Sequence, residues 1–133
     1  MGITFTFKIN PEQKHSAYEL GYMEGELNIH FNQKLFFHDP HNNLAELAAQ
    51  LDKWMNSGSQ KDFIFKTIDH DEPILTFQYE SSNQWRLHSI WQNFEPEDTI
   101  HTIALKSAAK KFLENLNKEF NRIGYDVKFD DHT

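Results

Sequence analysis

The sequence predicts an α+β fold: a mostly antiparallel sheet of six to seven strands, with two helices packed on one face. Several short segments alternate apolar and polar residues, which is typical of half-buried strands. Two longer segments carry apolar residues at helical spacing. Connections of turn length join most of the expected strands, and this favours antiparallel pairing. The 133 residues fit one domain that spans positions 1–133.

The first part of the chain predicts a strand followed by a hairpin. Apolar and polar side chains alternate cleanly in "ITFTFKI", residues 3–9. The run that ends at Phe31 alternates in the same way. Asn32 and Gln33 fit a two-residue turn into "KLFFH", residues 34–38. We therefore expect three strands here.

The period then changes to that of an amphipathic helix. Asn43 and Glu46 have the spacing of a capping box, and Gly58 is a suitable end. The expected buried stripe of this helix consists of Leu44, Leu47, Ala48, Leu51, Trp54 and Met55.

Three more strands and a second helix follow. The strands are "DFIFKTI" (62–68), "PILTFQY" (73–79) and "WRLHSIWQNF" (85–94), joined by the hairpin-length loops "DHDEP" and "SSNQ". The second helix ends before Gly124, while its beginning, "TIHTIAL", is β-branched enough to be partly extended. "YDVKF" after Gly124 is a candidate final strand. Within this fold we expect three tryptophans in the core: Trp54, Trp85 and Trp91.

The charge of the chain points to a basic partner. Thirteen basic and 20 acidic residues give a formal net charge of −7, which disfavours binding to nucleic acid or to anionic membranes. Seven acids lie between positions 69 and 98, where Arg86 is the one base. The chain has no cysteine, and its first ten residues lack the layout of a signal peptide. We therefore expect a cytoplasmic protein that does not enter the membrane.

Two polar clusters have the composition of metal or acid–base sites. "DHDE" at 69–72 offers carboxylate and imidazole ligands, and "HDPH" adds His38, Asp39 and His41. Neither cluster has the spacing of a calcium loop or of a helical zinc site, and both are compositions common in turns. The chain also lacks a nucleophile elbow and a glycine-rich phosphate loop. We expect no metal, no cofactor and no enzymatic activity.

Four segments resemble a known family. "LAELAAQLDKWM", "PILTFQY", "WRLHSIWQNFE" and "KKFLENLNKEF" are similar to small cytoplasmic immunity proteins of bacterial polymorphic-toxin systems, including contact-dependent inhibition. The likeness covers about residues 42–123, and its most specific part is the Ser-Ile-Trp-Gln-x-Phe ending at Phe94. It implies tight binding and neutralisation of the C-terminal domain of a cognate toxin, often a nuclease. We expect the protein to be a monomer or weak dimer.

The acidic segment is the expected binding surface. If the meander pairs as predicted, the "DHDE" turn and the loop before the second helix emerge at one edge of the sheet. The expected partner-binding residues are Asp69, His70, Asp71, Glu72, Glu95, Glu97 and Asp98. The alternative surface is the face of the second strand with Tyr22, Glu24, Glu26 and His30. Two other functions fit the same sequence: an acidic interaction module such as a secretion chaperone or adaptor, and a small metal-dependent hydrolase.

Overall fold

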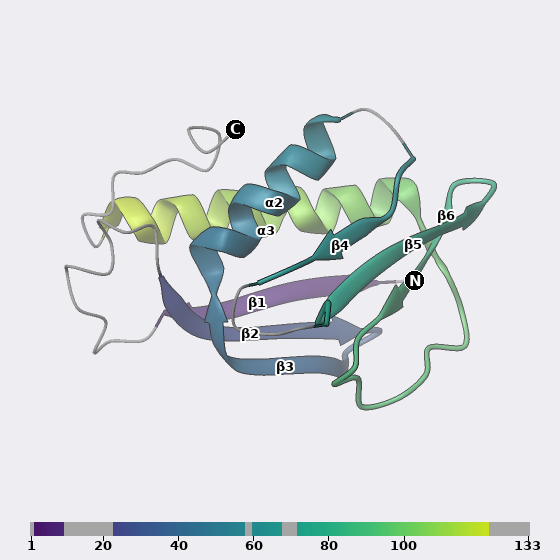
Figure 1. Cartoon of the computed structure of the whole chain (residues 1–133), viewed down its shortest axis with the longest axis horizontal. Coiled ribbons are helices and arrows are strands. Elements are labelled where there is room, and N and C mark those ends of the chain that lie inside the picture. Colours follow the sequence, from purple (N-terminus) through teal and green to yellow (C-terminus); the bar gives the residue numbers. More distant parts are fainter. Residues whose placement is uncertain (1, 10–22, 58–59, 68–71, 123–133) are drawn as a thin grey trace.

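The computed structural model describes residues 2–9, 23–57, 60–67 and 72–122. These residues form seven strands in two antiparallel sheets, together with two helices (Figure 1). The α+β class and the number of strands agree with the prediction from the sequence. The predicted single sheet is wrong, because in the described part no strand of one sheet pairs with a strand of the other.

The first sheet has the order β1-β2-β3 and the second has the order β4-β5-β6-β7. The helix α2 contacts β2, β3 and β4, whereas α3 contacts β1, β6 and β7, so the helices join the two sheets. The elements are β1 (Ile3–Ile9), β2 (Glu24–Phe31), β3 (Lys34–Asn43), α2 (Leu44–Asn56), β4 (Phe63–Phe65), β5 (Leu75–Ser81), β6 (Gln84–His88), β7 (Ile100–His101) and α3 (Thr102–Arg122).

The first sheet follows the predicted strand and hairpin. Asn32 and Gln33 form the expected two-residue turn, with φ angles of 52° and 69° that suit the right-handed twist of a hairpin. The strand β3 is longer than predicted and runs through Pro40. A proline, which lacks an N–H group, is tolerated there because β3 lies at the edge of its sheet and Pro40 is exposed.

The helix α2 begins as its sequence predicts. The Asn43 side chain accepts hydrogen bonds from the backbone N–H of Glu46 at 3.4 Å and from that of Met23 at 3.0 Å. This cap therefore ties the start of α2 to the start of β2. The predicted stripe is buried except at Met55, which is half-buried.

In the second sheet β4 and β6 are shorter than the sequence predicts, while β5 has the predicted length but begins two residues later. Ser82 and Asn83, with φ angles of 51° and 62°, make the tight turn between β5 and β6. The strand β6 ends at His88, six residues before the predicted end at Phe94. The segment "TIHTIAL" is partly extended as expected, because β7 pairs with β6 immediately before α3 begins.

One continuous core lies between the sheets and the helices. Its centre is Phe77 of β5, whose ring lies 6.1 Å from that of Phe5, 5.6 Å from that of Trp54 and 4.9 Å from that of Phe63. Trp54 and Trp85 are buried as predicted. Aromatic contacts therefore connect β1, α2 and β4 to the middle of the second sheet.

The helix α3 closes the described part of the chain. At its end Arg122 hydrogen-bonds to Glu119, and these bonds hold the pKa of the Glu119 carboxyl below its usual range. Neither described helix is long and apolar enough to cross a membrane. The predicted helix ends at Gly58 and Gly124 and the predicted strand at 125–129 lie outside the described residues.

Gly25 provides a test of this packing. A Cβ atom at this position would lie 2.6 Å from both the Lys8 carbonyl oxygen and the Leu44 Cδ1 atom. We expect Gly25→Ala to lower the free energy of unfolding by about 1–3 kcal/mol, since the backbone of β1 has to move. Urea denaturation measures the change.

Gly2→Ala is the control, because nothing lies within 4 Å of a Cβ atom there. Its effect should stay within about 0.5 kcal/mol. Equal stability of the two variants would show that β1 and α2 are not held this closely.

Candidate partner-binding surface

The chain leaves β6 through a turn that is held by side chains. Ser89 is buried, and its Oγ donates a hydrogen bond to the Ile74 carbonyl at 2.6 Å and accepts one from the Trp91 N–H at 3.0 Å. The Ser89 N–H is bound in turn by the Gln92 side-chain oxygen at 3.0 Å. These bonds replace the strand ladder, which explains why β6 stops at His88.

The turn displays two large apolar side chains. Ile90 is 48% exposed and Trp91 is 38% exposed, so the prediction that Trp91 lies in the core is wrong. Its indole ring instead stacks on Phe37 of β3, with ring centroids 6.2 Å apart. The inward-outward alternation of a strand does not continue past Ser89, and the position of Trp91 therefore cannot be read from that period.

The next residues fasten the loop to the first sheet. The Asn93 backbone N–H binds the Phe36 carbonyl at 2.8 Å, and the Asn93 side chain binds the Leu35 carbonyl at 3.2 Å. The Phe94 ring packs edge-on against that of Phe36, and the Lys34 ammonium lies 4.7 Å from the centre of the same ring. The loop is consequently anchored on both sides of the apolar pair.

Acidic side chains surround the end of this loop. Glu95, Glu97 and Asp98 are exposed on either side of the buried Pro96. Together with the tip of the β2–β3 hairpin they line a hollow of about 330 Å³. Within the described residues none of these three carboxylates forms an ion pair, although Glu95 accepts a hydrogen bond of 3.4 Å from Gln92. Three carboxylates therefore line a hollow in which Lys34 is the one base.

The expected acidic surface is described only in part. Asp69, His70 and Asp71 lie outside the described residues, while Glu72 is exposed. Ser89, at the start of the loop, binds the Ile74 carbonyl. Glu72 is two residues before Ile74, so Glu72 lies near the start of the loop.

The other three acids are farther along the loop, beside β6. The Pro96 carbonyl accepts a hydrogen bond from Arg86 at 3.4 Å, and the Thr99 hydroxyl donates one to Gln84 at 2.8 Å. Along this path Ile90 and Trp91 come between Glu72 and the later acids. The structure thus adds an exposed apolar pair to this loop, which reasoning from the sequence missed. The sequence signal that could have revealed this pair is the Ser-Ile-Trp-Gln motif, where the alternation of apolar and polar residues ends.

The second polar cluster connects strands. The His38 Nδ1 atom lies 2.6 Å from the Asn28 side-chain oxygen, and the His41 Nδ1 atom lies 3.0 Å from a Glu24 carboxylate oxygen. Asp39 is buried and accepts a hydrogen bond from the His41 backbone N–H. In the part of the chain that the structure describes, no three histidine, aspartate or glutamate side chains are placed to hold a metal ion.

The fold and this loop define an α+β domain that displays an apolar pair among acidic residues. The chain belongs to the family described as "Domain of unknown function (DUF7878)", whose model matches residues 3–122. Comparison with curated proteins and with solved structures gave no match.

The different environments of two tryptophans can be tested by unfolding. Trp85 is fully buried and donates a hydrogen bond of 2.6 Å to the Thr102 hydroxyl. We expect Trp85→Ala to cost about 3–5 kcal/mol because it leaves a large cavity. Trp91→Ala should cost only about 1–2 kcal/mol, since its ring is partly in water before the substitution.

Urea denaturation of both variants measures this difference. A loss for Trp91→Ala as large as that for Trp85→Ala would mean that Trp91 serves the core rather than the surface.

Proposed function

We propose that this protein is a cytoplasmic immunity protein, which binds and neutralises the C-terminal domain of a cognate toxin. The observation that carries the proposal is the exposure of Ile90 and Trp91 on a hydrogen-bonded turn, beside carboxylates that form no ion pair in the described residues. The resemblance to immunity proteins is most specific in this same turn. The motif and the displayed surface therefore coincide.

An apolar centre with a charged rim is the usual layout of a protein interface. Tryptophan is enriched among the residues that contribute most binding energy, and such residues lie in the centre of the contact. Here Trp91 is anchored on Phe37, and the backbone before it is held by Ser89. A surface ordered before binding loses less conformational entropy when its partner arrives.

The charge of the rim favours a basic partner. Glu72, Glu95, Glu97 and Asp98 are all exposed and can attract lysine and arginine from a distance. Nuclease domains have to bind polyanionic substrates, so their active surfaces tend to be basic. An acidic inhibitor can cover such a surface and associate with it rapidly.

The gene immediately upstream supplies the most direct test. We expect it to encode a protein whose C-terminal domain stops bacterial growth when expressed alone, and co-expression of the present protein should restore growth. The two purified proteins should form a stable complex. A complex with a non-toxic upstream product would favour a secretion chaperone or adaptor, and the absence of any complex would contradict the proposal.

The apolar pair should determine the lifetime of that complex. We expect Trp91→Ala to weaken binding by at least about 30-fold, as removal of a central interface residue costs roughly 2 kcal/mol or more. Surface plasmon resonance should assign the change mainly to faster dissociation. Ile103→Ala is the control, because Ile103 is 73% exposed on α3 and outside this loop.

The acids should instead control association. Substituting Glu97→Lys and Asp98→Lys together should slow association and reduce its dependence on salt, with little change in stability. Glu114→Lys, which changes an exposed acid on α3, is the matched control. Unaltered association in the double variant would move the binding surface elsewhere, with the Glu24 and Glu26 face of β2 as the next candidate.

A further inference from the structure

Open edges of β-sheets carry unpaired backbone N–H and C=O groups, and beside two of the edge strands in this protein some of these groups are bound by side chains. The outer edge of β3 is bound by Asn93, as described above. Beside β4, the Gln50 side chain of α2 donates to the Lys66 carbonyl at 2.8 Å and accepts from the Lys66 N–H at 3.3 Å. The Trp54 indole N–H, also from α2, binds the Lys61 carbonyl at 2.8 Å at the other end of β4.

The outer edge of β1 has no such cover in the described part of the chain. The Asn32 backbone N–H donates a hydrogen bond of 2.8 Å to the Gly2 carbonyl, and this bond fixes the alternation of the ladder between β1 and β2. The Gly2 N–H donates a second bond of 2.8 Å to the Asn32 side-chain oxygen. By this alternation the backbone groups of Ile3, Phe5 and Phe7 point away from β2. No hydrogen bond reaches these outward groups from any described residue.

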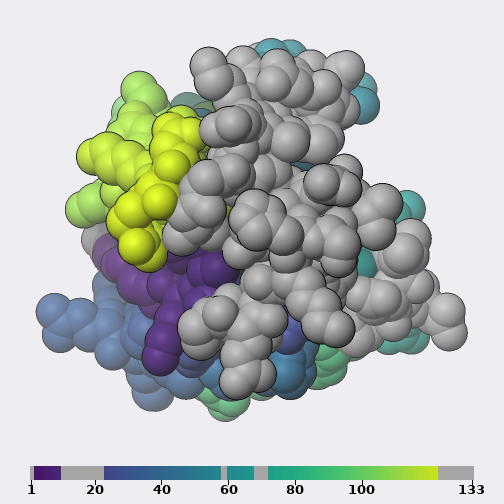
Figure 2. Space-filling model, turned by 90° about the vertical axis from the view of Figure 1, so that its left-hand side faces the viewer, coloured from purple at the N-terminus to yellow at the C-terminus, as the bar shows by residue number. Residues whose placement is uncertain are grey.

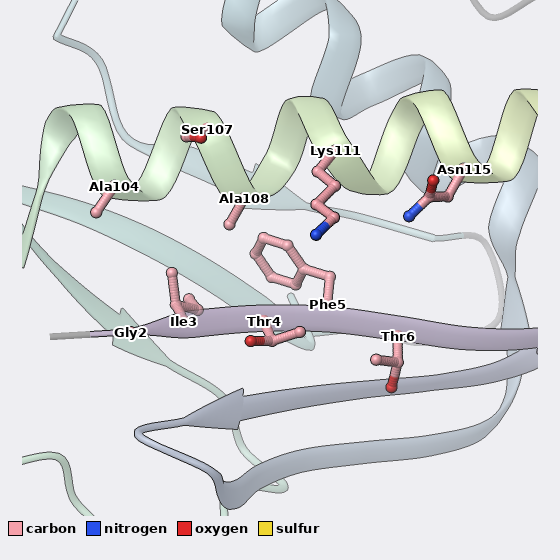
Figure 3. Close-up of a pocket in the computed structure, with 10 residues that line it drawn as sticks. All are labelled: Gly2, Ile3, Thr4, Phe5, Thr6, Ala104, Ser107, Ala108, Lys111 and Asn115. Carbon is pink, nitrogen blue, oxygen red and sulfur yellow. The ribbon is translucent and has the colours of Figure 1, made fainter.

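A groove of about 450 Å³ follows this open edge. Gly2 and the first residues of β1, up to Thr6, form one wall and α3 forms the other. The two elements lie side by side at the surface (Figure 2). Ala104 and Ala108 point from α3 toward β1, so small side chains leave the groove open (Figure 3). The ring of Phe5 lies between the two elements.

The groove also carries a positive charge. Lys111 is the one charged side chain among its lining residues, and it points from α3 toward β1 (Figure 3). Within the described residues Lys111 forms no ion pair. A ligand that fits both the open edge and the lysine would be an extended peptide, which pairs with β1 and places a carboxylate beside Lys111.

We propose that the edge of β1 binds an extended, acidic segment of another protein, which adds a fourth strand to the first sheet. Main-chain hydrogen bonds to Ile3, Phe5 and Phe7 supply sequence-independent affinity in this binding mode. Lys111 supplies the preference for an acidic side chain. A second copy of β1 is a poorer occupant, because its own exposed Lys8 would approach a groove that already holds a lysine.

This site is separate from the Ile90 and Trp91 surface, and its test does not depend on a toxin. The probe is a display library of random linear peptides of about ten residues, long enough to pair along all of β1. Selection against the full chain should enrich alternating β-branched residues with one aspartate or glutamate at a fixed position. The best synthetic peptide is then labelled, and its affinity is measured by fluorescence anisotropy.

Variants of α3 locate the bound peptide. Lys111→Glu should weaken binding at least about tenfold, whereas Lys110→Glu, which changes an exposed neighbour outside the groove, should not. Ala108→Leu should also weaken binding by filling the groove. Trp91→Ala should bind the peptide normally, which separates this site from the proposed toxin surface. Equal effects of the two lysine variants would overturn the assignment.

Amide hydrogen exchange tests the strand pairing itself. With peptide bound, the amides of Ile3, Phe5 and Phe7 should exchange at least about tenfold more slowly, while those of Thr4 and Thr6, which already face β2, should change little. The proposal fails if the library yields no binder or if a binder leaves these amides unprotected. It also fails if these amides are already protected in the absence of peptide. Protection at every protein concentration would mean that the chain covers its own edge. Protection only at high protein concentration would mean that a second copy covers it.

Discussion

The two sheets of this protein are held together by aromatic side chains rather than by strand pairing. Phe77 is the common contact, because its ring meets those of Phe5 from the first sheet and Trp54 from α2. Trp54 in turn contacts Trp85 at 5.4 Å, which extends the cluster to β6. Packing in this cluster holds the second sheet against the first. The loop after β6, which binds the edge of β3, therefore depends on the cluster for its position.

The sequence predicted local structure better than it predicted pairing between segments. Residues 3–9, the turn at Asn32, the Asn43 cap and the extended start of α3 all follow from nearest neighbours, and the structure confirms them. Beside β3 and β4, side chains rather than another strand bind backbone groups. Asn93 binds Leu35 of β3 from 58 positions along the chain, and Gln50 binds Lys66, just after β4, from 16 positions. Periodicity has no information about such contacts.

The same limit applies to the candidate surface. The sequence correctly placed Glu95, Glu97 and Asp98 in an exposed loop, because charge beside a proline is typical of such segments. It missed Trp91, since a large aromatic residue in a strand-like pattern is more often buried. The deciding element was Ser89, whose hydroxyl takes over the hydrogen bonds of the strand and turns the following residues outward. The loop after β6 and the edge of β1 thus both depend on which groups form hydrogen bonds with the backbone at the end or edge of a strand.

The uneven burial of the tryptophans gives the protein its own optical reporter. Trp54 and Trp85 are hidden from solvent, so a water-soluble collisional quencher has access mainly to Trp91. The nearby carboxylates would repel iodide and concentrate caesium around the same indole. Comparing the two ions in steady-state fluorescence would therefore report the local potential at the loop and its coverage by a ligand, without any label attached to the chain.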